Sequence, residues 1–377
     1  MSCVFCSSDN NLAGASLSLI PATQELRDHL AGVLAEHNLI FERRGAMLAL
    51  VSPKDPARAV ELLRHILSEP ERRGVTVASI GISGFPEQRS LDDWWRIQET
   101  GWLEQAMANP FGSGDPESRG PAFTIWFQPI IDTSNNRPVA HECLARVHSG
   151  TRHLCRQHSA AEILDAAWLR RSEREVDNKL RQLSLQAIAD RGGAGAFFIN
   201  FLPHTIYEPA LCLAETFSVL RRSGISPVKM VFEAVRAAES EHNHLRFIAD
   251  TLRDRGCCIS LDDLGVANGG IQLLQDLRPE YVKLSPALLH EIESPVCASA
   301  IRRIVEAADR CGAIVVAKNV ESARTVENLW LLGVQYMQGY FFGRPAPMPV
   351  QPQADLLNLA SAIEGATLPD LMMMYRT

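Results

Sequence analysis

Short apolar runs recur along the chain from residue 121 onward, and segments with helical spacing of apolar positions separate them. Most of these runs are continuously apolar, which is typical of strands that are buried on both faces of a sheet. About eight strand–helix units in about 240 residues indicate a TIM barrel, which is an α/β fold. The runs that we predict to be barrel strands are residues 124–131, 197–201, 229–232, 257–261, 281–284, 314–317 and 334–337.

Residues 1–110 follow a different pattern, in which strand-like segments alternate with two helical ones. Their order, β-α-β-β-α-β, is typical of a small ferredoxin-like α/β domain. Gly45 separates the two middle strands and indicates a hairpin. The predicted strands are residues 15–20, 39–43, 47–51 and 75–81, and the predicted helices are residues 22–37 and 56–67.

A stretch rich in proline and glycine separates these two parts. Residues 111–120 are therefore predicted to be a linker between a domain at 1–110 and a barrel at 121–346. The tail at 347–377 carries apolar residues at helical spacing, and we predict that it is helical. Packing on the barrel and presentation of an apolar face to a partner are both compatible with that pattern.

The composition is that of a globular protein with a small excess of acidic residues. The formal net charge is −7 and no block of lysine and arginine stands out, which argues against nucleic acid or a membrane surface as a partner. No apolar run approaches the roughly 18 residues of a membrane span, and no secretory signal is evident. The nine cysteines are scattered, as in proteins with reduced thiols. We therefore expect a cytoplasmic protein.

Polar residues lie at or just after the ends of several predicted strands. They are Asn200, Glu233, Asp262, Asp263, Lys283, Lys318 and Gln338. The carboxyl ends of barrel strands share one face, so we expect these side chains to form one site. Clustered carboxylates suit Mg²⁺, and a pair of such ions activates water for attack on phosphorus. Simple capping of the following helix by Asp262 and Asp263 explains the same spacing, and the spacing leaves both interpretations open.

A series of motifs in this half of the chain resembles a known family. Residues 142–146 read ECLAR, and residues 127–130 before them read FQPI. Residues 262–265 read DDLG, and a segment from Gln338 through Arg344 reads QGYFFGR. These motifs resemble, in order, those of the EAL-domain family of cyclic di-GMP phosphodiesterases, over residues 121 to 346. The resemblance implies a TIM barrel.

The resemblance also implies roles for individual residues. Glu142, Lys283 and Glu233 match catalytic positions, with Lys283 near the attacking water. The matched metal ligands are Glu142, Asn200, Glu233 and Asp262, with Asp263 on a second metal. The residues expected to contact the ligand are Gln128, Arg146, Asn200, Asp262, Lys318, Glu321, Gln338 and Arg236, of which Arg146 matches a phosphate contact.

Three positions depart from the family pattern. Lys318 and Ser285 stand where the family has acidic metal ligands, and Arg236 replaces an acid that supports the loop after Glu233. A unit charge at about 4 Å contributes roughly 4 kcal/mol at an effective dielectric constant of about 20. The loss of two carboxylates and the gain of an ammonium therefore disfavour Mg²⁺ or Mn²⁺, which we expect only if the protein is catalytically active. We predict little or no hydrolysis.

The first domain is similar to a truncated GGDEF domain, the usual neighbour of EAL domains. Ala46 and Met47 stand at the two acidic positions of that signature, so cyclase activity is not expected. An unrelated α/β sensor module is the alternative. In the barrel, the alternating charges of the helix at 172–188 predict a solvated surface.

Three functional hypotheses follow from these residues and the resemblance. The leading one is a non-catalytic cyclic di-GMP receptor or regulatory adaptor, in which Lys318 pairs with a phosphate or with Glu142. The alternatives are a nucleotide-free scaffold for protein partners and an active phosphodiesterase that produces pGpG. A protein partner in a signalling pathway is expected, and a homodimer is possible although the loop at 263–270, near which the family dimerises, is changed.

Overall fold

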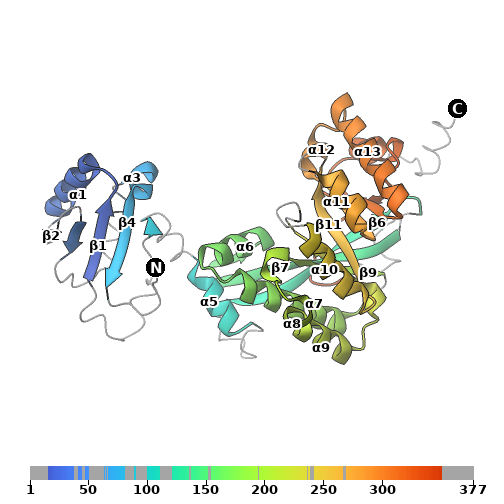
Figure 1. Ribbon diagram of the computed structural model, residues 1–377, viewed down its shortest axis with the longest axis horizontal. Coiled ribbons are helices and arrows are strands. Elements are labelled where there is room, and N and C mark those ends of the chain that lie inside the picture. The colour runs from blue at the N-terminus through green and yellow to red at the C-terminus, as the bar shows by residue number, and fades with distance from the viewer. Residues whose placement is uncertain are drawn as a thin grey trace. The chain divides into compact units, whose positions relative to one another are not determined.

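The computed structural model describes two compact units of the chain (Figure 1). The first comprises residues 1–105 with 165–171, and the second comprises residues 106–164 with 172–377. The described residues are 16–37, 41–44, 47–50, 63, 65, 67–80, 89–90, 100–110, 121–135, 137–151, 154–193, 195–235, 237, 242–265 and 269–349. The predicted tail at 347–377 and the linker at 111–120 lie almost entirely outside them.

The first unit contains an antiparallel sheet. Its strands are β1 (Ser16–Pro21), β2 (Phe41–Arg44), β3 (Met47–Leu50), β4 (Val75–Ile80) and β5 (Arg89–Ser90), in the order β2-β3-β1-β4-β5. Its described helices include α1 (Gln24–Glu36) and α3 (Glu69–Arg73), and α5 (Gly101–Ala108) spans the boundary between the two units at residue 105. The four predicted strands and the first predicted helix are present with shifted ends. The helix predicted at 56–67 lies largely outside the described residues, and the resemblance to a GGDEF domain stays a prediction.

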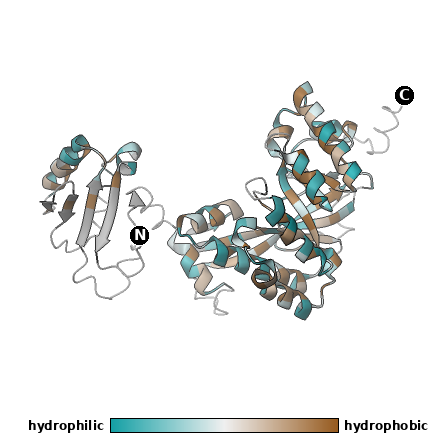
Figure 2. Cartoon of the chain, in the orientation of Figure 1, coloured by the Kyte–Doolittle hydropathy of each residue, from teal (hydrophilic) through white to brown (hydrophobic). Residues whose placement is uncertain are grey.

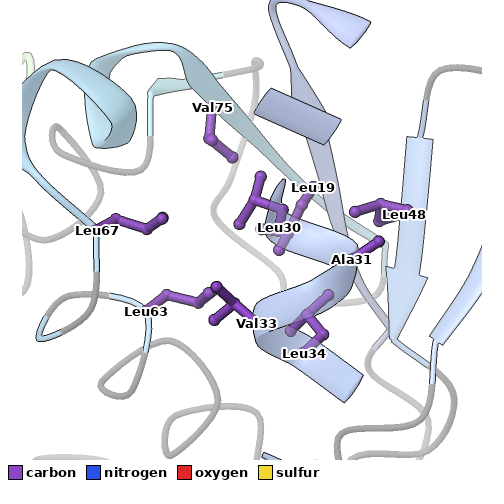
Figure 3. Close-up of a cluster of buried hydrophobic side chains, with 9 residues drawn as sticks. All are labelled: Leu19, Leu30, Ala31, Val33, Leu34, Leu48, Leu63, Leu67 and Val75. Carbon is purple, nitrogen blue, oxygen red and sulfur yellow. The ribbon is translucent and has the colours of Figure 1, made fainter. Parts of the chain in front are cut away.

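Helix α1 begins at a capped turn and packs through one apolar face. The side chain of Thr23 accepts a hydrogen bond from the backbone nitrogen of Leu26 at 3.2 Å, which satisfies a free N–H group of the first turn. Leu30 and Leu34, spaced by one turn, are fully buried in a cluster with strand residues such as Leu48 (Figure 3). This cluster is the hydrophobic core of the first unit.

The second unit is a closed barrel of eight strands. They are β6 (Ala122–Asp132), β7 (Arg137–Thr151), β9 (Ala196–Phe201), β10 (Met230–Ala234), β11 (Cys258–Leu264), β12 (Tyr281–Leu284), β13 (Ile314–Ala317) and β14 (Tyr336–Met337). The order β6-β14-β13-β12-β11-β10-β9-β7 is closed by pairing of β6 with β7. A further strand, β8 (Leu154–His158), pairs with β7 outside the ring.

The barrel departs from the predicted repeat of eight strand–helix units at its first two strands. β6 is antiparallel to both β7 and β14, whereas the others run parallel to one another. The search for continuous apolar runs does not predict β7, because charged residues such as Glu142 and Arg146 interrupt its apolar residues. The seven strands that were predicted are all present. The prediction of a closed barrel is confirmed, with one strand reversed.

Helices cover the outside of this barrel. They are α7 (Glu173–Arg191), α8 (Pro209–Cys212), α9 (Ala214–Ser223), α10 (His242–Arg253), α11 (Gly270–Leu277), α12 (Pro286–His290), α13 (Pro295–Cys311) and α14 (Ala323–Leu331). A further helix, α6 (Ala160–Leu169), is divided between the two units at residue 165. Figure 2 shows mixed hydrophilic and hydrophobic colouring along them, as expected of amphipathic helices. The prediction that the helix at 172–188 is solvated is wrong for Asp177 and Arg181, which are buried.

Apolar side chains fill the middle of the barrel below its polar face. Ile130, Ala140, Phe198, Val231 and Val316, from five different strands, form one buried cluster. Among the described helices, none is long and apolar enough to cross a membrane.

We predict that Gly339→Ala strongly destabilises the barrel. A Cβ atom at Gly339 would overlap the backbone nitrogen and oxygen of Val320, and backbone atoms cannot rotate away as side chains do. The free energy of unfolding, measured with urea and circular dichroism, should fall by about 3 kcal/mol or more. Gly265→Ala is the matched control, because no atom of the described residues, apart from the glycine and its chain neighbours, lies within 4 Å of the Cβ position there. Equal stability of the two variants would show that the barrel tolerates a side chain against Val320.

Candidate functional site

A fully buried lysine lies at the centre of the polar face of the barrel. Strand β12 carries Lys283, whose Nζ is 2.8 Å from Oε2 of Glu142 on β7 and 2.6 Å from Oε2 of Glu233 on β10. The ammonium also lies 5.0 Å from the centre of the Phe198 ring. Three strands therefore each supply a group that compensates the burial of this charge.

Glu142 accepts hydrogen bonds at both carboxylate oxygens. Asn200 donates to Oε1 at 2.9 Å, and Gln338 donates to Oε2 at 2.7 Å. Gln338 also donates to Gln128 at 3.0 Å, and the antiparallel course of β6 places Gln128 opposite Glu142. Burial favours the neutral acid, but the charge of Lys283 and these hydrogen bonds outweigh it and lower the pKa of Glu142 to about 2.

The two carboxyl groups beside Lys283 differ in their preferred protonation state. Burial, together with the charges of Glu142 and Asp262, raises the pKa of Glu233 well above its ordinary value, although Lys283 opposes this. Burial lowers the pKa of Lys283, but the charges of Glu142 and Glu233 outweigh it and raise that pKa. A charged Lys283 thus lies between two carboxyl groups, of which Glu142 gives up its proton more readily than an ordinary glutamic acid and Glu233 less readily.

A second lysine pairs with two aspartates at the end of β11. Nζ of Lys318 lies 2.5 Å from Oδ1 of Asp262 and 2.6 Å from Oδ1 of Asp263. The side chain of Lys318 is 17% exposed, so solvent reaches it. Burial lowers the pKa of Lys318, but the two aspartates outweigh it and raise that pKa. The sequence-based hypothesis that Lys318 pairs with Glu142 is wrong, since Lys283 occupies that position.

The side chains as placed do not fit the pair of divalent cations that the family pattern implies. A metal shared by Asp262 and Asp263 would need the space beside their oxygens, and the ammonium of Lys318 lies there. Both oxygens of Glu142 already accept hydrogen bonds. Within the described ranges, no three histidine, cysteine or acidic side chains are grouped so as to hold a metal ion.

Arg146 lies near the same face, on β7. Its guanidinium is 5.8 Å from the centre of the Trp126 ring and donates to the carbonyl oxygen of Ala145 at 2.9 Å. Burial lowers the pKa of Arg146, while the neighbouring Tyr340 and Glu142 oppose that change. Arg146 is therefore a half-buried cation close to Glu142.

The remaining predicted residues are less informative. Glu321 is exposed, and Arg236 lies outside the described residues. Ser285 precedes helix α12, and its side chain makes no capping hydrogen bond there.

The sequence interpretation missed Phe198, whose ring faces the Lys283 ammonium. Its position two residues before Asn200, on the same face of β9, is the signal that would have found it.

We predict that Lys283→Met destabilises the protein far more than Glu233→Gln does. Removal of the ammonium leaves the ionised Glu142 buried without its charged partner, and breaking such a pair costs about 3–5 kcal/mol. Because burial raises the pKa of Glu233 and favours its neutral form, its replacement by a neutral amide in Glu233→Gln should cost under about 1.5 kcal/mol. Urea unfolding of both variants at pH 7 measures the difference. A larger loss in Glu233→Gln would show that Glu233 is ionised.

We predict that the double substitution Lys318→Glu with Ser285→Asp creates binding of Mn²⁺. It removes the ammonium from Asp262 and Asp263 and adds two carboxylates. Calorimetric titration with MnCl₂ should give saturable heat for the double variant and at least about tenfold weaker binding for the unchanged protein. Lys229→Glu, at an exposed position, controls for the added negative charge. Equal affinity in all three proteins would show that the charge at positions 285 and 318 does not control metal binding.

Comparison with known proteins gives the family. Residues 117–345, more than half of the chain, match the EAL domain family. The cyclic di-GMP phosphodiesterase PdeF of Escherichia coli (strain K12) is 26% identical over 231 residues, which are 60% of this chain and 30% of that protein. The cyclic di-GMP phosphodiesterase RocR of Pseudomonas aeruginosa is 25% identical over 240 residues, 60% of this chain and 58% of RocR. The matches thus span less than two thirds of these relatives.

Solved structures show the same fold. A standalone EAL protein from Vibrio cholerae O395, in its c-di-GMP-bound form, is 25% identical with a TM-score of 0.54, and the match covers 62% of this chain and 97% of that one. The FimX EAL domain of Xanthomonas citri, at 18% identity, gives a TM-score of 0.57 over 68% of this chain and 97% of its own. The ordered motifs, the closed barrel and these matches show that the chain belongs to the EAL-domain family of cyclic di-GMP phosphodiesterases.

Proposed function

We propose that this protein is a receptor for cyclic di-GMP that binds the dinucleotide without hydrolysing it. The observation that carries the proposal is the position of Lys318, whose ammonium lies between Asp262 and Asp263. The lysine supplies positive charge beside carboxylates that the family pattern assigns to metal ions. The phosphodiester groups of the ligand need such positive charge when they leave water.

Two cations near the polar face suit the two phosphates of the ligand. Lys318 is partly exposed, and Arg146 is a half-buried guanidinium suited to bidentate phosphate contacts. Lys283 is fully buried and already compensated by Glu142 and Glu233, so we assign it a structural part. The V. cholerae relative with bound c-di-GMP supports the choice of ligand.

The same charges oppose hydrolysis. Water is a poor nucleophile toward a phosphodiester unless a bound metal ion or a strong base activates it. Lys318 repels a divalent cation from Asp262 and Asp263. Burial raises the pKa of Glu233, so this carboxyl group holds its proton more tightly than an ordinary glutamic acid. The regulatory output then passes through contacts with a protein partner.

The second candidate function is phosphodiesterase activity, and one observation favours it. Five residues that match catalytic and metal-binding positions of the family lie at one face of the barrel. They are Glu142, Asn200, Glu233, Asp262 and Lys283. Formation of linear pGpG from cyclic di-GMP with Mg²⁺ or Mn²⁺ would establish this activity and overturn the receptor proposal.

The test is a calorimetric titration of the full chain with cyclic di-GMP, first in Mg²⁺ and then in EDTA. We expect saturable binding of equal affinity in both buffers, because protein cations replace the metal. Arg146→Ala should weaken binding by about tenfold or more, equivalent to about 1.4 kcal/mol. Arg324→Ala, at an exposed position on α14, is the matched control. The absence of heat in both buffers would instead support a nucleotide-free scaffold.

A further inference from the structure

A cavity lies on the outside of the barrel, apart from the residues of the EAL site. Its volume is about 330 Å³. Helices α7, α8 and α9 and the 3₁₀ turn Pro203–Thr205 surround it. Its lining includes Arg174, Asn178, Arg181, Thr205, Cys212 and Glu215. All of these residues belong to the second unit.

A buried guanidinium forms the floor of this cavity. The side chain of Arg181 is only 2% exposed. It donates to Asp177, to Thr216 at 3.3 Å and to Asn178 at 3.2 Å. These bonds use three of its five N–H groups, and the other two have no acceptor among the described residues. Burial lowers the pKa of Arg181 to about 10, so the group stays charged at neutral pH.

Asp177, the partner of this guanidinium, accepts three hydrogen bonds. Asp177 accepts hydrogen bonds from the backbone nitrogen of Leu202 and from the Thr205 hydroxyl, each at 2.9 Å, besides that from Arg181. These contacts orient Arg181 and compensate part of the cost of its burial. A carboxylate that enters the cavity meets a preorganised donor pair.

The rim of the cavity carries the opposite charge. Glu175 and Glu215 are both exposed, and Glu215 accepts a hydrogen bond from Asn178 at 3.3 Å. With Asp177, these acids outnumber the two guanidiniums of Arg174 and Arg181 by one. A simple anion is therefore not favoured. A ligand that carries both a carboxylate and an ammonium can pair the carboxylate with Arg181 on the floor and the ammonium with the acids of the rim.

Apolar surface adjoins these charged groups. Leu211, which is 75% exposed, and Cys212 line the cavity on the α8 side. The guanidinium of Arg174 lies 4.6 Å from the centre of the Tyr207 ring and donates a hydrogen bond to its hydroxyl. These contacts hold Arg174 in the lining of the cavity. This surface is available to the side chain of a small ligand.

We propose that this cavity is a binding site for a free α-amino acid. The carboxylate pairs with the two unused N–H groups of Arg181, and the ammonium pairs with Glu215. The side chain of the ligand lies against Leu211. This site is separate from the cyclic di-GMP site, and neither proposal depends on the other.

The test measures thermal stability of the full chain with glycine, leucine, glutamate and arginine, each at about 10 mM, followed by titration calorimetry of any that stabilise it. We expect at least one to raise the melting temperature. Acetate and methylamine, each with one of the two charged groups, should give no measurable shift at the same concentration. No shift with any of the four amino acids, or an equal shift with acetate, would overturn the proposal.

Substitution at the rim locates the site without disturbing the buried cluster. Glu215→Gln should weaken binding of the amino acid by about tenfold or more, because the amide lacks the charge that pairs with the ammonium. Glu208→Gln, an exposed acid outside the cavity lining, should leave it unchanged. Titration of both variants with cyclic di-GMP should match the unchanged protein. Unaltered affinity of Glu215→Gln for the amino acid would refute the site.

Discussion

The ammonium of Lys283 lies inside the barrel with no exposure to solvent, and the neighbouring strands supply what compensates it. Burial of an isolated charge costs several kcal/mol, so Glu142 on β7 and Glu233 on β10 must both lie within reach of β12. The network then extends through Asn200 and Gln338. Closure of the barrel and formation of the polar face are therefore linked by one charge.

The second lysine, Lys318, differs from Lys283 in its exposure to solvent. Lys318 is partly exposed and contacts Asp262 and Asp263, whereas Lys283 is enclosed. A partly exposed ammonium exchanges its partners at lower cost than a buried one, since water compensates each intermediate state. For this reason the proposed function assigns the ligand contact to Lys318 and not to Lys283.

Charged residues of helix α7 differ in their burial although they belong to one alternating charge pattern. Glu173, Glu175 and Lys179 are partly or fully exposed, as expected for a helix rich in both signs of charge. Asp177 and Arg181 lie one turn apart in the same sequence, yet both are buried. Spacing places these two side chains on one face, but only the packing of α9 and the turn after β9 determines whether that face is covered.

The amino-acid sequence alone predicts the barrel, the order of its motifs and the substitutions at 285 and 318, because short apolar runs and specific residue types are local properties. The apolar runs do not predict β7, because charged residues interrupt its apolar positions. They also do not predict the reversal of β6, which places Gln128 opposite Glu142. The carboxylate that each lysine contacts becomes known only from the folded structure. Pairing depends on distances between strands that lie far apart in the chain, and residue spacing does not contain those distances.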